Sequence, residues 1–101
     1  MLELRPTCER CNKALPPAST EAMICSFECT FCQGCVELLH NVCPNCGGGF
    51  TARPIRPEQD WKNGNTLARY PATGKVTYKP VDLAEHAALV MRLEKLPPER
   101  R

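Results

Sequence analysis

The sequence is poor in the features that build a large hydrophobic core. It has 101 residues, and only six are aromatic: three Phe, two Tyr and one Trp. A chain of this length with so few large side chains buries little apolar surface, which excludes a large enzyme fold. It also lacks a long uncharged apolar run, which excludes a transmembrane helix. Something other than side-chain packing must therefore stabilise the chain.

The first residues lack the apolar stretch of a secretory signal peptide. Glu3, Arg5 and Pro6 stand where that stretch would be needed. We therefore expect a cytoplasmic protein whose cysteines are reduced, because structural disulfides are rare in that compartment.

Motifs of common catalytic sites are missing as well. We find no Ser/His/Asp set, no acidic pair and no phosphate-binding loop, since the glycines at 47–49 are not followed by Lys and Ser or Thr. His40 and His86 are interpreted as a capping or surface histidine and a helix-surface histidine. The sequence therefore predicts a protein that is not an enzyme.

Cysteine is the residue that the chain has in excess. There are eight cysteines, and all lie within residues 8–46. Most fall in pairs with two residues between them, a spacing that lets a tight turn direct both sulfurs at one metal ion. Such close pairs are poorly placed for disulfides, so we interpret them as ligands of two Zn²⁺ ions. Iron, either alone or in an iron–sulfur cluster, uses the same type of ligand.

Two residues next to the cysteines support metal-binding turns. Asn12 follows Cys11, and Gly47 follows Cys46. Both residue types tolerate the left-handed backbone conformation that often closes such a turn. We expect backbone N–H groups to point at the sulfurs there and to stabilise their negative charge.

Spacing alone permits two ways of dividing the cysteines between two ions. In a sequential scheme the first four cysteines bind one ion and the last four bind the other. In a cross-braced scheme, site 1 consists of Cys8, Cys11, Cys32 and Cys35. Site 2 then consists of Cys25, Cys29, Cys43 and Cys46. Either scheme leaves no coordination position open for a reacting water.

A resemblance to RING fingers bears on this choice. The run Cys29–Val36 resembles the central RING signature, and Cys43–Cys46 resembles the closing pair of ligands. Cys29 takes the position that histidine usually holds. The resemblance implies a small metal-stabilised α+β fold, a RING-like cross-braced module with one hairpin and one short helix.

A second resemblance covers about the first 57 residues. The runs Leu2–Pro6, Cys25–Cys32 and Cys43–Phe50 are similar to a cysteine-rich family of small bacterial proteins classed as domain of unknown function 1272. This likeness implies a bacterial protein but no activity.

Three stretches of the chain differ in composition. We expect a RING-like zinc-binding module at 1–50, an extended Pro/Arg connector at 51–60 and a cysteine-free tail at 61–101. In the tail, the β-prone runs Thr66–Tyr70 and Lys75–Lys79 flank a turn-forming segment and predict a hairpin.

A helix should end the tail. Asp82 is placed to cap it, with Glu85 completing a capping-box pattern, and good helix formers continue to about Leu96. Its apolar positions are Leu83, Ala87, Leu89, Val90, Leu93 and Leu96. We expect this face to pack on the hairpin or on the metal module; a docking or dimerisation helix is the alternative.

The charge distribution argues against nucleic acid as a partner. Residues 1–46 carry a net charge of −2 and the remainder +4. Eight thiolates and two divalent cations would lower the total from +2 to −2. The basic and stacking side chains that could still contact nucleic acid are Arg53, Arg56, Trp61, Lys62, Arg69, Tyr70, Lys75, Tyr78 and Lys79.

These observations predict a non-catalytic, zinc-binding structural module that interacts with another protein. A zinc–thiolate redox sensor is the alternative. Ubiquitin-ligase-like binding of a conjugating enzyme is a weaker one: Leu38, Leu39 and Pro44 match the RING docking platform, whereas the Glu9–Arg10 pair and Gly47 do not. No cysteine is marked by the sequence as unusually exposed.

Overall fold

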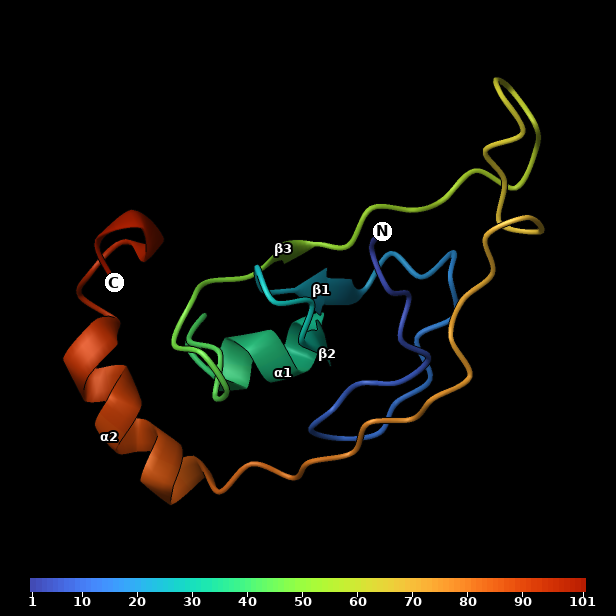
Figure 1. Cartoon of the computed structure of the whole chain (residues 1–101). Coiled ribbons are helices and arrows are strands. Elements are labelled where there is room, and N and C mark those ends of the chain that lie inside the picture. Colours follow the sequence, from blue (N-terminus) through green and yellow to red (C-terminus); the bar gives the residue numbers. More distant parts are fainter.

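The computed structural model describes all 101 residues and shows a small α+β head embraced by a long tail (Figure 1). The head contains the three-stranded antiparallel sheet and the helix α1, Gln33–Leu38. Strands β1, Ala22–Ile24, and β2, Thr30–Cys32, form the expected hairpin, with Met23 opposite Phe31. The prediction of a small α+β module with one hairpin and one short helix is confirmed.

A third strand comes from the segment that we expected to be a connector. Strand β3, Thr51–Ala52, pairs with β1 and places Ala52 opposite Met23, so that the sheet order is β2-β1-β3. The first residues of the connector thus belong to the head, because an unpaired β1 edge accepts another extended segment.

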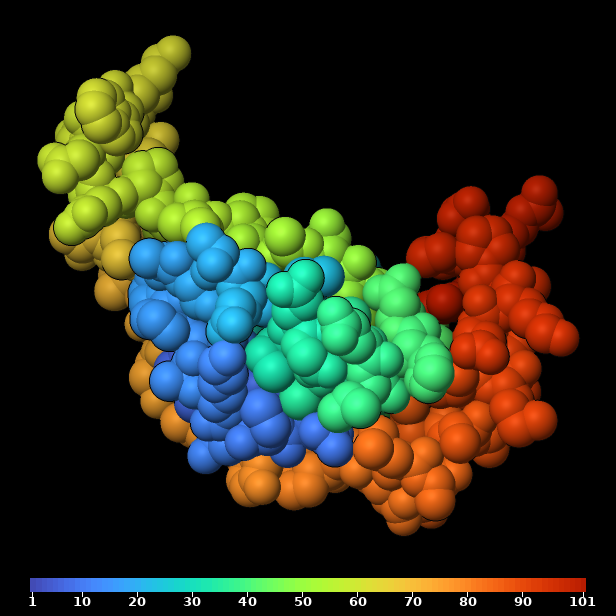
Figure 2. Space-filling view, turned by 180° about the vertical axis from the view of Figure 1, so that it is seen from behind, coloured from blue at the N-terminus to red at the C-terminus, as the bar shows by residue number.

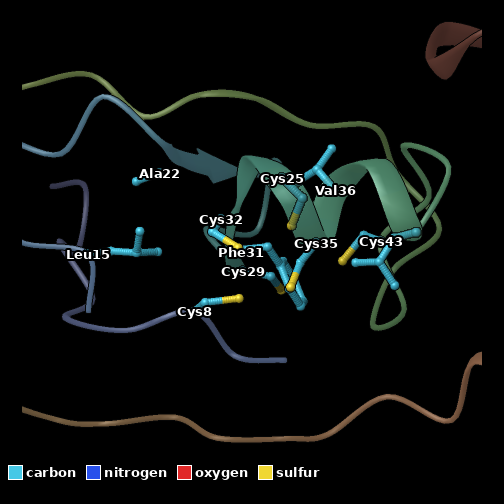
Figure 3. Close-up of a cluster of buried hydrophobic side chains, with 11 residues drawn as sticks. Cys8, Leu15, Ala22, Cys25, Cys29, Phe31, Cys32, Cys35, Val36 and Cys43 are labelled. Carbon is cyan, nitrogen blue, oxygen red and sulfur yellow. The ribbon is translucent and has the colours of Figure 1, made fainter. Parts of the chain in front are cut away.

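The buried core is small and consists largely of cysteines. Six of its eleven residues are cysteines, and the others are Leu15, Ala22, Phe31, Val36 and Leu39. Figure 3 shows these side chains gathered below and beside α1. Phe50 packs edge-on against Phe31, with the ring centroids 5.3 Å apart.

The prediction of a hairpin in the tail is wrong. No strand forms between residues 61 and 82. Instead, the extended part of the tail runs along the head: the N–H of Thr73 donates to the carbonyl of Leu4, and that of Lys79 to the carbonyl of Glu9. Lys79 of the second β-prone run therefore bonds to the head, whereas in the first run the N–H of Leu67 donates to the carbonyl of Pro57.

The tail helix is confirmed, but it is shorter than expected. Helix α2, Leu83–Leu93, begins at Asp82, whose side chain accepts from the N–H groups of Ala84 and Glu85. It stops three residues before Leu96, because Leu96 precedes Pro97 and is disfavoured in the helical conformation. A short 3₁₀ turn, Pro98–Arg100, follows.

Helix α2 docks on the head through part of the predicted apolar face, together with a histidine that the apolar pattern leaves out. His86 and Val90 are its buried residues, whereas Leu83 and Ala87 are exposed. The ring Nε2 of His86 lies 3.2 Å from the carbonyl oxygen of Leu39. The prediction of a helix-surface histidine is therefore wrong: an imidazole satisfies a carbonyl at the end of α1, which leucine cannot do.

The whole molecule measures 45 × 27 × 18 Å. Figure 2 shows the segment around residue 60 projecting as an arm from one end, with α2 at the other. No helix combines the length and apolar character that crossing a membrane requires.

Candidate metal centre

Four cysteine sulfurs converge at site 1. The Sγ atoms of Cys8, Cys11, Cys32 and Cys35 all lie within 4.8 Å of one another. Those of Cys11 and Cys32 are 3.8 Å apart. Four sulfurs that surround one zinc ion at about 2.3 Å are separated by about 3.8 Å in a tetrahedron. The donor set therefore fits a metal ion with tetrahedral thiolate coordination.

Local structure explains why these four meet. Cys8 and Cys11 lie in a turn closed by the antiparallel bridge between Thr7 and Ala14. Cys32 ends β2, and Cys35 lies in the first turn of α1. The junction between β2 and α1 thus faces the turn that contains Cys8 and Cys11.

Three sulfurs converge at site 2. The Sγ atoms of Cys25, Cys43 and Cys46 lie within 4.8 Å of one another. Cys25 directly follows β1, and the other two lie in the turn after α1. Cys29 is buried in the same core but lies outside this group of three. Its assignment as the fourth ligand stays a prediction.

The two groups interleave along the chain. Cys11 lies beside Cys32 and not with Cys25, its neighbour in the sequential scheme. The first and third cysteine pairs meet at one place, and members of the second and fourth meet at the other. This is the grouping of the cross-braced scheme that the RING resemblance implied.

The turns around the sulfurs have the expected geometry. Asn12 and Gly47 adopt left-handed conformations, with φ of 62° and 78°. The N–H of Phe27 donates to the sulfur of Cys25 and that of Gly48 to the sulfur of Cys46, both at 3.4 Å. These backbone dipoles stabilise negative charge on the sulfurs, as a bound metal requires.

Burial makes four of the eight thiols hold their protons more tightly. Desolvation raises the pKa of Cys35 to about 12, and it also raises the pKa of Cys29, Cys32 and Cys43. A buried thiolate without a cation is unfavourable. A bound divalent cation would reverse this preference.

Arg10 is the charged neighbour of site 1. Its Nη1 donates to the sulfur of Cys35 at 3.5 Å, and this hydrogen bond raises the pKa of the Arg10 guanidinium. A tetrathiolate site with one divalent cation carries a formal charge of −2, so an adjacent guanidinium offsets part of it.

Two cysteines are exposed, which the sequence did not indicate. They are Cys11 of site 1 and Cys46 of site 2. Burial acts to raise the pKa of Cys11, but hydrogen bonds from the Lys13 backbone and the neighbouring thiols outweigh it, and the pKa is lowered. Each cluster thus has one cysteine at the surface.

Neither histidine belongs to these clusters. His40 is exposed, and its Nδ1 lies 3.6 Å from a carboxylate oxygen of Glu94, the residue that follows α2. His86 contacts the carbonyl of Leu39. Both histidines therefore connect the head with the tail.

The RING-type platform residues divide between core and surface. Leu39 is fully buried, whereas Leu38 is half exposed. Helix α2 lies beside both Leu38 and Pro44, and it lines a surface hollow with each of them. The chain's own tail therefore borders the surface that these residues form.

Sequence reasoning missed the structural role of two arginines. Arg53 is 3% exposed and donates to the carbonyls of Arg5, Leu15 and Pro16. Arg56 donates to the carbonyls of Leu2 and Tyr70. Nothing in the sequence distinguishes these arginines from a basic surface for nucleic acid, but in the structure both bind carbonyl oxygens.

Comparisons with known proteins give a family. The model of the family DUF1272, described as "Protein of unknown function (DUF1272)", matches residues 1–56. "Uncharacterized protein R02474" of Rhizobium meliloti (strain 1021) is 49% identical over 89 residues, which are 87% of this chain and 99% of that protein. No solved structure gives a significant match.

Proposed function

This chain belongs to the DUF1272 family of proteins of unknown function, and we propose that it is a non-catalytic, zinc-binding module that interacts with another protein. The observation that carries the proposal is the convergence of four sulfurs at site 1, with a spacing that matches tetrahedral thiolate coordination. Zinc is the usual ion in such sites of small domains.

The metal supplies folding free energy in this proposal. Only 19 of the 101 residues are buried, and many of these are cysteines. Binding of a structural zinc ion is worth on the order of 10 kcal/mol, which counts toward folding. Two ions would therefore cross-link loops that the small core alone leaves marginal.

The absence of catalysis follows from the ligand count. If four thiolates surround each ion, no coordination position remains for water or substrate. The exposed surface of the head and tail then carries the function through contacts with a partner protein.

Elemental analysis of the purified full-length protein tests the metal assignment. We expect two zinc ions per chain, and one ion per chain in Cys11→Ser and in Cys46→Ser. The control is Ser26→Ala, which changes an exposed residue in the turn after Cys25 and should keep both ions. A content of one ion or none in the wild type, or iron in place of zinc, would contradict the proposal.

Affinity capture with the metal-loaded chain tests the interaction. We expect a protein that is retained by the loaded chain and lost when helix α2 is deleted. Retention of nucleic acid in a salt-sensitive manner would instead favour nucleic-acid binding.

A redox sensor is the second candidate, because each cluster has an exposed ligand. In particular, Cys11 combines exposure with a lowered pKa, the combination that marks reactive thiols. This function predicts zinc release at low peroxide with formation of a defined disulfide. Retention of both ions under peroxide would exclude it.

A further inference from the structure

Glu9 is a carboxylate side chain that is almost completely buried. It lies between Cys8 and Cys11, in the turn that supplies half of site 1, and it is 1% exposed. A buried ionised group needs charged or hydrogen-bonding partners, because its hydration is lost. Its partners therefore show what the side chain holds in place.

The carboxylate binds three segments at once. Its Oε2 accepts from the N–H of Thr30 at 2.6 Å and from Nη1 of Arg5 at 3.0 Å. Its Oε1 lies 3.4 Å from Nδ2 of Asn45. The Glu9 backbone makes two further hydrogen bonds. Its N–H donates to the carbonyl of Thr30, and its carbonyl accepts from the N–H of Lys79 in the tail.

Two of these partners are direct neighbours of cysteines that are predicted for site 2. Thr30 directly follows Cys29, and Asn45 lies between Cys43 and Cys46. A side chain from the site 1 turn thus holds the two chain segments that supply three cysteines predicted for site 2. Cys29, which lies outside the cluster of three sulfurs, is the ligand whose position depends most directly on this bond.

We propose that Glu9 couples the two metal sites, so that metal at site 1 raises the affinity of site 2. This rests on the proposed function, since it requires that both sites bind an ion. An ion at site 1 fixes the turn of Cys8 and Cys11, and with it the Glu9 carboxylate. The ordered carboxylate then positions Cys29 and Asn45, which lowers the conformational entropy that site 2 loses on binding. By linkage, metal at site 2 raises the affinity of site 1 by the same factor.

Glu9 is a positioning residue, and its chemistry suits the task. An ionised carboxylate is an acceptor at every lone pair, so it can face the three donors from Thr30, Arg5 and Asn45. Glutamine has nearly the same shape, but it would present its NH₂ group to at least one of these donors. Glu9→Gln should therefore break the link with little change in volume.

The first experiment measures how zinc is distributed in wild-type protein that has been stripped of metal and then half-loaded. Native mass spectrometry of the full chain counts the ions per molecule. Two independent, equal sites place about half of the molecules in the one-zinc state. We expect coupling of at least about tenfold, which makes the zero-zinc and two-zinc species dominate. A majority of one-zinc species would overturn the proposal.

The second experiment compares variants by zinc titration against a competing chelator. Glu9→Gln should bring the one-zinc species up to the independent-site level. Glu37→Gln is the matched control, because it makes the same charge change at an exposed position of α1 and should leave the coupling intact. Equal behaviour of Glu9→Gln and Glu37→Gln would overturn the proposal.

A third arm separates positioning from a general loss of stability. Cys11→Ser disables site 1 through an exposed ligand, so the affinity of site 2 can be measured alone. In that background Glu9→Gln should cost site 2 much less than it does in the intact chain. An equal cost in both backgrounds would mean that Glu9 only stabilises the fold, and would overturn the proposal.

Asn45→Ala keeps the test decisive if Glu9→Gln does not fold. Asn45 is exposed, so its truncation removes one arm of the link without opening the core. We expect it to weaken the coupling partly, and unchanged coupling would count against the proposal. A wild type that binds fewer than two ions contradicts the proposed function itself, whereas two ions bound independently contradict only the coupling.

Discussion

A thiol must lose its proton before it binds a metal ion, and burial makes this loss harder here. The pKa of Cys35 rises from an ordinary value of 9.0 to about 12, and that of Cys43 rises as well. Without metal, the raised pKa favours the folded state up to about pH 9, and this contribution disappears as the pH rises through the folded-state value. With metal, protons compete with the cation for the same sulfurs, so the loaded state is favoured at higher pH.

We therefore predict that metal affinity falls as the pH is lowered from about 8 to about 5. Zinc uptake near neutral pH should release protons, because burial raises the pKa of Cys29, Cys32, Cys35 and Cys43 and these thiols start protonated. Competition with a chromophoric chelator at several pH values measures the first effect, and calorimetry in buffers of different ionisation enthalpy measures the second. An affinity that is independent of pH would show that thiolates are not the ligands.

Arg53 gives a prediction for stability. Its buried guanidinium satisfies the carbonyls of Arg5, Leu15 and Pro16. Arg53→Ala should destabilise the metal-loaded protein by about 2–5 kcal/mol, because it leaves these acceptors without a donor. Urea unfolding measures the loss. The exposed Arg92→Ala in α2 is the control and should change the free energy of unfolding by less than about 0.5 kcal/mol.

At the scale of residues, the sequence indicated the cysteines but not their supports. A Cys-x2-Cys pair carries its chemistry in its spacing, so the clusters could be predicted once the RING likeness suggested how they interleave. Glu9 and Arg53 carry no such signal. Both are charged residues, a type that is usually found at the surface, and only the tertiary fold supplies the backbone groups that make their burial tolerable.

At the scale of elements, α2 depends on a single capping side chain. Asp82 accepts from the N–H groups of Ala84 and Glu85, at 2.9 and 3.3 Å. Asp82→Ala should destabilise the helix by about 1 kcal/mol, whereas Asp82→Asn keeps an acceptor and should remain near the wild type. Faster amide hydrogen exchange within α2 would show the effect, and equal exchange rates in the two variants would contradict it.

The same helix shows why one tail element was predicted and another was not. Its cap, its helix formers and the prolines that follow are local signals, and local signals suffice to predict a helix. The expected hairpin had equally good local signals in Thr66–Tyr70 and Lys75–Lys79. It does not form, because Leu4 and Glu9 offer carbonyl groups along the head, and a choice of hydrogen-bond partner is a tertiary property.

At the scale of the whole molecule, the two clusters bring together cysteines from segments that lie far apart along the chain. Removal of zinc by a chelator should unfold the head, and the tail should come free with it, because α2 docks on Leu39 at the end of α1. Loss of dispersed amide resonances, restored when zinc is added back, measures this. A chelated chain that keeps its dispersed spectrum would show that the cysteines are not structural ligands.

The exposed arm determines how such unfolding can be observed. Trp61 is the sole tryptophan, and 81% of it faces water. Its indole is therefore hydrated in the folded state, much as it would be in a denatured chain. The wavelength of tryptophan emission should therefore change little when the ions are lost. Ultraviolet absorption of the sulfur-to-metal bonds would report the loss of the ions directly. An unchanged emission maximum would accordingly be no sign that the head is intact.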